Sequence, residues 1–486
     1  MADPTSKLFE SAGNGFIQEG PQLGNFYQKD DVLPQALRRL FAEKKEGLSL
    51  WRFVETDLKK FGGRCSNVLH PMMAPMERQK PWVEEYTVYG RRINKLHTCP
   101  QWKFMKKESA VQGLVSIGYT ERQKYGGLAR IWQFAKLHLF SPNSGLYGCP
   151  LAMTDGAAKL LEGIVTGTEK EAHDKVIVRS GTSSHALCMD AYQRLISRDP
   201  EIFWTSGQWM TERGGGSDVR GGTRTIAVPP SNPSDDAYHK LYGYKWFSSA
   251  TDADMAVTLA LPSKSPEEKR SSCFLVILPK NDGASSQAGV PVPVQGGVPV
   301  PAQGGVPGRD GKGPIWIAKL KDKMGTRQLP TAELELYGAD ALQLSKEGRG
   351  IPMVTRLVNI TRLHNCVAAT GLMSKASMLA QDYATKRTAF GSKLCDKPLH
   401  LATLASMRTI YTASLLLTLD IAKYLGDIES SPESPQISET KDIMRLLTPL
   451  GKLYTGKAVI NVLSETIESF GGIGYLESSG IPQMAR

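Results

Sequence analysis

The sequence lacks the features that mark several classes of protein. No stretch reaches the roughly 18 uncharged apolar residues that a membrane span needs. The nearest candidate is residues 409–419, which lie between Arg408 and Asp420 and are better explained as a buried helix. The seven cysteines form no C-x-x-C pair, and the eight histidines form no H-x-x-x-H or H-E-x-x-H pattern. We therefore expect no membrane span, no metal site and reduced thiols.

Targeting signals are also scarce at both ends of the sequence. The N-terminal segment MADPTSKLFESAGNGF has no apolar signal core and carries the early acids Asp3 and Glu10, which transit peptides avoid. The last residues, Met484-Ala485-Arg486, are no known peroxisomal address. We expect a cytoplasmic protein, although the sequence leaves a mitochondrial or peroxisomal location open.

Charge of one sign dominates without forming a dense patch. The formal net charge is +11, an excess that favours polyanions such as nucleic acid, acidic lipid or phosphate-bearing cofactors. The basic residues form short groups such as Lys59-Lys60 and Lys106-Lys107. A solvated surface explains each group better than a binding site does, so a phosphate-rich ligand is compatible with the charge but not required by it.

Helical patterning fills both ends of the chain, and β-type patterning lies between them. Residues 1–205 are predicted to be an N-terminal extension and a helical domain. Residues 206–341 contain short aromatic and β-branched runs that end at Pro262 and Pro279, which predicts a middle β domain. Residues 342–486 return to helical spacing and predict a C-terminal helical bundle.

A Pro- and Gly-rich insert interrupts the predicted β domain at residues 283–313. Two copies of one repeat, GVPVPVQG and GVPVPAQG, occupy residues 289–304. Prolines at this density fix φ and remove backbone donors, so we expect a surface loop between two strands rather than a packed element.

The glycine run Gly214-Gly215-Gly216 is the first candidate for chemistry. Without Cβ atoms, this backbone can approach a planar or phosphorylated ligand closely, and Thr211 and Ser217 flank it with hydroxyls. The run is neither a G-x-x-x-x-G-K-[ST] loop nor a G-x-G-x-x-G turn. Alone, it is more often a simple turn.

The glycine run belongs to one of four motifs that follow each other along the chain. They are M-T-E-R-G-G-G-S-D-V from Met210, K-W-F-S-S from Lys245, R-T-A-F-G from Arg387 and F-G-G-I-G-Y from Phe470. In this order they resemble the acyl-CoA dehydrogenase family over residues 90–486. The form of the first motif, together with L-K-D-K-x-G-x-R from Leu320 to Arg327, is similar to the AidB-like branch. The resemblance implies an α+β multidomain fold with an N-terminal helical domain, a middle β domain and a C-terminal helical bundle.

The resemblance implies FAD as cofactor. The residues that match the loop hydrogen-bonding the flavin ring and diphosphate are Met210, Thr211, Gly216 and Ser217. Phe247 and Ser249 match the Trp-x-Thr pair that covers the ring, with the aromatic face and the hydroxyl both kept. The simpler explanation of Phe247 is an aromatic of the strand core.

Two further segments match family residues that reach the flavin of a neighbouring subunit. These residues are Arg387, Ala389 and Phe390 in one segment and Glu468, Phe470, Gly471 and Gly472 in the other. If the match holds, FAD binding requires a homo-oligomer, a dimer or a tetramer. The alternatives are that Arg387 pairs with Asp382 or Asp396, and that the glycines only stop a helix.

The family reaction needs a carboxylate base, and the sequence does not supply one where the family has it. In most members, a Glu follows an M-x-R-D motif, which would place it beyond Arg486. In a second group, the Glu precedes an Arg, and the matching pair here is Thr361-Arg362. Thr361 cannot act as that base, whereas Arg362 and Ser217 match residues of the substrate pocket.

We therefore expect a C-terminally truncated chain with an incomplete bundle. The missing helix would expose apolar surface on residues 450–470 and make the product prone to aggregation. The predicted function is FAD-dependent oxidation of the CH–CH group of a fatty acyl thioester, with an electron-accepting flavoprotein as partner. The alternatives are a non-catalytic acyl-CoA or lipid binder and a DNA-binding AidB-like flavoprotein.

Overall fold

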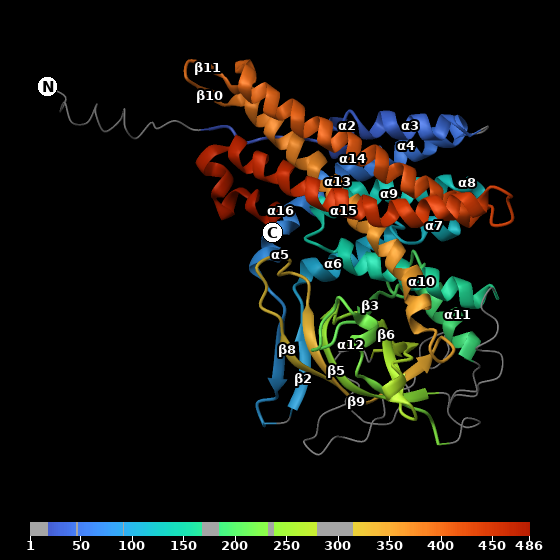
Figure 1. The fold of residues 1–486 in the computed structure, drawn as a ribbon. Helices are drawn as coiled ribbons and strands as arrows, with labels where there is room; N and C mark the ends of the chain where they lie inside the picture. Colours follow the sequence, from blue (N-terminus) through green and yellow to red (C-terminus); the bar gives the residue numbers. More distant parts are fainter. Residues whose placement is uncertain (1–17, 45–46, 91, 168–183, 232–237, 279–313) are drawn as a thin grey trace.

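The computed structural model describes residues 18–44, 47–90, 92–167, 184–231, 238–278 and 314–486. Helices from both ends of the chain lie together above one β-sheet, as Figure 1 shows. The predicted order of helices, strands and helices is confirmed. The predicted insert at 283–313 follows β7 and precedes β8, and it lies outside the described residues.

The N-terminal part is helical apart from one hairpin. Its central helix, α9, is buried on every side, since it lies between other helices. A hairpin of β1 and β2, which pairs Trp82 with His97, interrupts the predicted helical run. The elements are α2 (Phe26–Lys29), α3 (Leu33–Ala42), α4 (Gly47–Arg64), the π-helix Cys65–Leu69, α5 (His70–Arg78), β1 (Trp82–Tyr86), β2 (Arg92–His97), α6 (Pro100–Val111), α7 (Ile117–Thr120), α8 (Arg122–Tyr125), α9 (Leu128–Phe140), the 3-10 turn Ser141–Asn143, α10 (Gly148–Val165) and α11 (Ser184–Leu195).

A seven-stranded sheet in the order β3-β5-β4-β6-β7-β9-β8 forms the middle of the described chain. The additional pairings of β3 with β6 and of β5 with β9 fold the sheet back on itself. Its inner face buries Trp209, Phe274 and Leu334. The elements are β3 (Ser206–Trp209), α12 (Val219–Gly222), β4 (Ile226–Val228), β5 (Tyr238–Ser249), β6 (Met255–Pro262), the 3-10 turn Pro266–Glu268, β7 (Ser272–Ile277), β8 (Ile315–Leu320) and β9 (Thr331–Gln343).

Three long helices dominate the C-terminal part. α13 packs against α9, α10, α14 and α15, so it joins helices from both ends of the chain. The sequence predicts one or two helices over residues 443–470, and the structure has a single helix, α15, that continues through Pro449. The elements are α13 (Gly350–Lys386), β10 (Thr388–Ala389), β11 (Ser392–Lys393), the 3-10 turn Leu394–Asp396, α14 (Pro398–Ser430), α15 (Ile437–Ser469), the 3-10 turns Gly471–Tyr475 and Glu477–Ser479, and α16 (Pro482–Ala485).

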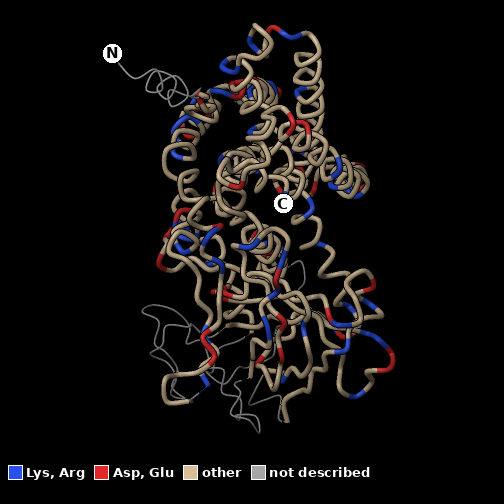
Figure 2. The backbone as a smooth tube through the Cα atoms, turned by 90° about the vertical axis from the view of Figure 1, so that its left-hand side faces the viewer, with Lys and Arg blue, Asp and Glu red and all other residues tan. Residues whose placement is uncertain are grey.

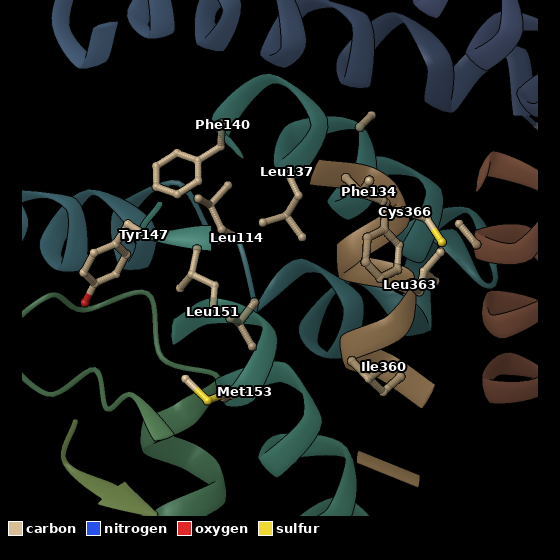
Figure 3. Close-up of a cluster of buried hydrophobic side chains, with 14 of the residues drawn as sticks. Leu114, Phe134, Leu137, Phe140, Tyr147, Leu151, Met153, Ile360, Leu363 and Cys366 are labelled. Atoms are coloured by element: carbon tan, nitrogen blue, oxygen red, sulfur yellow. The ribbon is translucent and has the colours of Figure 1, made fainter. Parts of the chain in front are cut away.

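The main core lies where α9, α10 and α13 meet. Phe134 and Leu137 of α9, Leu151 of α10, and Leu363 and Cys366 of α13 belong to this cluster of buried side chains, shown in Figure 3. Truncating one such side chain to Ala typically costs about 2 to 5 kcal/mol. This core therefore fixes the position of α13 relative to the N-terminal helices, and α13 carries several residues of the site described below.

The charged residues are mixed over the molecule rather than segregated. Figure 2 shows Lys and Arg distributed along the whole described backbone, with Asp and Glu between them. In the described ranges, no helix has the length and apolar character to cross a membrane. Within the same ranges, no cluster of His, Cys, Asp and Glu is suited to hold a metal ion.

Candidate functional site

A cavity of about 570 Å³ lies where the N-terminal helices, the sheet and the C-terminal helices meet. This volume is within the range of small-molecule and cofactor sites. The N-terminal part contributes Met73, Glu77, Ser141, Pro142, Gly145, Leu146, Gly148, Cys149, Ala152 and Met153; the β part contributes Gln208, Met210, Thr211, Ser249, Gly325, Thr326 and Gln328; the C-terminal part contributes Thr361, His364, Asn365, Ala368, Leu372, Val459, Ile460, Leu463, Gln483, Met484, Ala485 and Arg486.

Three of the predicted flavin-site residues line this cavity. Met210 and Thr211 follow β3 directly, and Ser249 ends β5, where β3 pairs with it through Gln208 and Ser249. The glycine loop continues from Thr211 onto the exposed surface, and it includes Gly216 and Ser217. A Cβ at Gly216 would lie 3.2 Å from Thr211 Oγ1, so this glycine lets the loop pack closely against the hydroxyl.

A buried carboxylate anchors both ends of the glycine loop. Glu212 accepts hydrogen bonds from the backbone N–H of Arg224 (2.8 Å) and Thr225 (3.1 Å) and from the Thr225 hydroxyl (2.7 Å). It also accepts from Lys245 Nζ at 2.7 Å, with both side chains buried. The Glu of this motif is therefore structural: it ties residues 212 and 224 together and fixes the exposed loop between them.

Phe247 lies on the outside of the sheet rather than in its core. Its side chain is 48% exposed, so the explanation as a strand-core aromatic does not hold. Lys321 Nζ lies 4.7 Å from the Phe247 ring centre and 3.4 Å from that of Trp246. The register of β5 is irregular between Lys245 and Ser248, so strand alternation does not by itself place Phe247 and Ser249 on one face.

The residues at this part of the cavity fit FAD. The Thr211 and Ser249 hydroxyls and the Gln208 amide supply the donors and acceptors that a flavin ring needs. A Cβ at Gly215 would meet nothing within 4 Å, so the exposed loop leaves open space for a bulky group. The exposed cations Arg213, Arg220 and Arg224 on this loop suit a diphosphate.

The two segments predicted to reach a neighbour's flavin meet at one end of the helical bundle. Phe470, at the end of α15, stacks on Tyr383 of α13 with ring centres 4.3 Å apart. The stack joins the end of α15 to the last turns of α13, and the β10–β11 hairpin that follows α13 lies at the same end of the bundle (Figure 1). The predicted residues here are Arg387, Ala389, Phe390, Glu468, Phe470, Gly471 and Gly472, and none of them lines the cavity of the same chain.

This end of the bundle is open to solvent. Phe390 is 96% exposed and has a φ of 53°, a conformation that non-glycine residues rarely adopt. Gly471 has a φ of 59°, and a Cβ there would meet nothing within 4 Å. Asp382, one alternative partner of Arg387, is bound by Lys386 at 2.9 Å and by Lys29 at 3.7 Å. Arg387 Nη1 donates to Gln18 Oε1 at 3.5 Å.

Thr361 faces the cavity, whereas Arg362 does not line it. The Thr361 hydroxyl donates to the Val358 carbonyl at 2.9 Å, and Arg362 Nη1 donates to Asn359 Oδ1 at 3.1 Å. Ser217 is likewise absent from the lining. Among the described lining residues, Glu77 is the single Asp or Glu, and the Gln328 amide donates to its carboxylate. No sequence pattern pointed to Glu77, because this residue lies outside every motif.

His364 connects the cavity to a buried charge network that sequence patterns did not reveal. Its Nε2 lies 2.8 Å from Asp155 Oδ2, and Arg130 Nη1 donates to Asp155 Oδ1 at 2.9 Å. Burial alone would raise the pKa of Asp155, but Arg130 and His364 outweigh it and hold the pKa well below its usual range. Arg130 also donates to Glu429 of α14 at 2.7 Å. The network thus ties the cavity wall to three other helices.

Two family descriptions match this chain. Residues 348–486 match the family described as acyl-CoA dehydrogenase, C-terminal domain, and residues 21–180 match the adaptive response protein AidB N-terminal domain. The chain is 40% identical over 475 residues to acyl-CoA dehydrogenase family member 11 of Caenorhabditis elegans, covering 97% of this chain and 68% of that protein. It is 25% identical to the putative acyl-CoA dehydrogenase AidB of Escherichia coli, covering 87% of this chain and 66% of that protein. The chain thus spans about two thirds of the length of these relatives.

Solved structures share the fold. Caenorhabditis elegans ACDH-11 in complex with C11-CoA has a TM-score of 0.82 and 38% identity, with 100% of this chain and 73% of that chain covered. An acyl-CoA dehydrogenase from Bacillus anthracis complexed with FAD has a TM-score of 0.61 and 17% identity, with 89% of this chain and 64% of that chain covered. At 17% identity, the second likeness concerns the fold alone.

Proposed function

Because the chain belongs to the acyl-CoA dehydrogenase family, an oxidoreductase family of FAD flavoproteins, we propose that its cavity holds FAD together with a fatty acyl thioester. One observation carries the proposal: the hydroxyls of Thr211 and Ser249 line the same cavity as the apolar side chains of α13 and α15. Polar atoms suited to a flavin ring and a surface suited to an acyl chain therefore meet in one space.

The chain's own residues divide the work of binding. Thr211 and Ser249 hydrogen-bond the ring, Phe247 covers it, and the loop fixed by Glu212 receives the diphosphate. When bound, FAD supplies the acceptor for the hydride that leaves the β carbon of the acyl group. Ala368 and Leu372 of α13 and Val459 and Leu463 of α15 contact the acyl chain and exclude water from it.

An acyl thioester as ligand is supported by the relatives. The structure of ACDH-11, 38% identical to this chain, contains C11-CoA. The size of the cavity and its apolar C-terminal wall are consistent with an acyl chain of this class. Free fatty acyl-CoA is therefore the ligand to test first.

A second candidate is acyl-CoA binding without dehydrogenation. Removal of the α proton needs a carboxylate, and Thr361 presents a hydroxyl where one group of relatives is expected to have that carboxylate. Glu77 is the single Asp or Glu in the described cavity lining, and Gln328 holds it from the β part. These two observations favour the binding function as the alternative outcome of the test.

Further expectations remain proposals. Arg387 and Phe390 do not line the cavity that Met210 and Thr211 line in the same chain, which favours a homo-oligomer, a dimer or a tetramer, in which a neighbour completes each flavin site. An electron-accepting flavoprotein as partner is an expectation from the family resemblance, and a cytoplasmic location stays a sequence-based expectation. Binding to DNA also remains a sequence-based hypothesis, and the mixed charges in Figure 2 give it no added support.

The test is a flavin spectrum followed by an anaerobic titration with C11-CoA. Purified protein is expected to show the visible absorbance of bound FAD, and the acyl-CoA is expected to perturb this spectrum. Bleaching of the flavin band supports dehydrogenation, whereas perturbation without bleaching supports the binding function. Protein that neither carries nor takes up FAD contradicts the proposal.

A substitution tests the proposed ring contact. Thr211→Val, which removes one ring contact, is expected to weaken FAD retention. The variant Lys319→Met, at an exposed site, serves as the control.

A further inference from the structure

Lys323 is a partly buried cation beside the proposed flavin site with only uncharged acceptors. It lies in the segment that joins β8 to β9, and its Nζ donates to the Leu329 carbonyl at 2.9 Å and to Thr331 Oγ1 at 3.1 Å. In the described part of the chain, no carboxylate forms an ion pair with it, unlike Lys321, which pairs with Glu333 at 2.7 Å. Its charge is therefore not neutralised locally.

A hydrogen bond connects Thr331 to Ser249. Thr331 Oγ1 and Ser249 Oγ are 3.1 Å apart, and either oxygen can be the donor. The Lys323 ammonium can only donate, so it binds a lone pair of Thr331 Oγ1. The Thr331 O–H is then free to donate to another acceptor. Ser249 Oγ lies within reach. When Thr331 donates to Ser249, the Ser249 O–H is in turn directed away from the pair and towards the cavity that Ser249 lines.

We infer that Lys323 is a positioning residue of the flavin site: through Thr331, it directs the Ser249 hydroxyl to donate to the cofactor, and its charge raises the cofactor's affinity for electrons. The inference rests on the proposed function, because it concerns FAD held against Ser249. It adds a residue outside the flavin contacts predicted from the sequence, on a segment whose motif carried no assigned role.

Two physical effects support this arrangement. Hydrogen bonds in a chain polarise one another, so a cation at one end strengthens the donor at the other. A positive charge near a group that gains electrons stabilises the reduced form, and partial burial weakens the screening of that charge. Burial lowers the pKa of Lys323 to about 8, so the ammonium form predominates at neutral pH. The neighbouring thiol, Cys149, stays neutral there because burial raises its pKa to about 11.

The experiment measures the reduction potential and the visible spectrum of FAD bound to the full chain. Lys323→Met is expected to disfavour two-electron reduction by about tenfold, which corresponds to a potential about 30 mV more negative. Lys323→Arg, which keeps the charge and the donors, is expected to restore most of the shift. Thr331→Val breaks the hydrogen-bond chain but keeps the cation, so it is expected to change the spectrum with a smaller shift in potential. Lys319→Met, at an exposed position of β8, is the matched control and is expected to behave as the parent.

The outcomes separate this inference from the proposed function. A parent protein without FAD contradicts the proposed function itself. If the parent carries FAD and both Lys323→Met and Thr331→Val keep the parent's potential and spectrum, only the role of Lys323 is contradicted. If Lys323→Met does not retain FAD, the other two variants decide the question. Parent-like spectra and potentials in both Thr331→Val and Lys323→Arg overturn the inference. A perturbed spectrum in Thr331→Val, together with a near-parent potential in Lys323→Arg, supports it.

Discussion

Lys245 and Glu212 form an ion pair inside the β domain, with Nζ and Oε1 2.7 Å apart and both side chains buried. Lys245 also donates to the Leu259 carbonyl of β6 at 2.9 Å, while Glu212 holds the backbone at residues 224 and 225. The pair therefore connects the glycine loop to the centre of the sheet. Burial lowers the pKa of Lys245 despite the attraction of Glu212, so its charge depends on this partner.

Glu212→Gln is expected to lower the free energy of unfolding by about 3 to 5 kcal/mol, because it leaves the buried Lys245 ammonium without a counter-charge. The loop that Glu212 anchors should loosen, and FAD should bind more weakly. Urea unfolding and FAD titration measure the two effects. The exposed variant Glu267→Gln is the control, with an expected change within about 0.5 kcal/mol.

The double variant Glu212→Gln/Lys245→Met tests the cause of that loss. It removes the stranded cation, so it should recover part of the stability while FAD binding stays weak. A Glu212→Gln protein as stable as the parent would show that the pair does not hold the loop.

From the lowered pKa of the buried Glu429 carboxyl, we predict that the protein loses stability in acid. Burial by itself raises the pKa of its carboxyl, but Arg130 and Lys159 outweigh burial and lower the pKa from 4.5 to about 2. A carboxyl with a lowered pKa in the folded state stabilises the fold above its unfolded pKa and loses that contribution as the pH falls towards its folded pKa. The contribution is about 3 kcal/mol, lost between about pH 4.5 and pH 2.

The measurement is the urea midpoint at a series of pH values from 7 to 3. The parent should become steadily less stable below about pH 4.5, whereas Glu429→Gln should start less stable at pH 7 and show a shallower decline. Glu433→Gln, at an exposed position in the segment that follows α14, is the control and should follow the parent. A Glu429→Gln protein with the parent's full pH dependence would mean that other carboxyls carry the effect.

How far the sequence predicts this molecule depends on the range of the interactions involved. Local patterns were sufficient for the β-like runs that became β5, β6, β7 and β9, because alternation and β-branched residues act within a few positions. The loop at Met210 was found because its motif is contiguous. The sequence left open whether residues 443–470 form one helix or two, and α15 is a single helix because packing along its whole length outweighs the backbone hydrogen bond lost at Pro449.

Contacts between distant residues were outside the reach of the sequence. Glu212 and Lys245 are 33 positions apart, and His364 and Asp155 are 209 apart. No spacing rule links such pairs; only the folded chain places them together. For the same reason, Glu77 was missed as a cavity residue, and Lys323 belonged to a quoted motif without any role for its side chain.

The exposed apolar residues of α15 predict self-association. Leu446, Leu450, Leu453 and Ile460 are all exposed and follow each other at steps of four, three and seven, so they form one stripe, here called the α15 stripe. Exposed apolar patches of this kind promote association. Leu453→Lys is expected to lower light scattering at micromolar concentration without changing helicity, and Ser464→Lys, at an exposed polar position of the same helix, should have little effect. Unchanged scattering in Leu453→Lys would exclude the α15 stripe as the cause.

Because Arg387 and Phe390 do not line the cavity that Met210 lines in the same chain, we predict that two chains complete one flavin site together. Gly216→Val crowds Thr211 and should impair the loop half of the proposed flavin site. Arg387→Ala should impair the half offered to a neighbour. Each variant alone is expected to retain little FAD, although both should fold, because these residues lie on the surface or partly exposed.

We propose to co-express the two variants with different tags. Purification through both tags in turn then yields mixed oligomers. In a mixed dimer, one of the two sites combines the intact loop of one chain with the intact Arg387 segment of the other, so about half of the parent's FAD per dimer should return. Co-expression of Gly216→Val with a second copy carrying the same substitution is the control and should restore none. If the mixed oligomer is as empty as the control, both halves belong to one chain and the shared site is wrong; recovery of flavin can only come from a site built across two subunits.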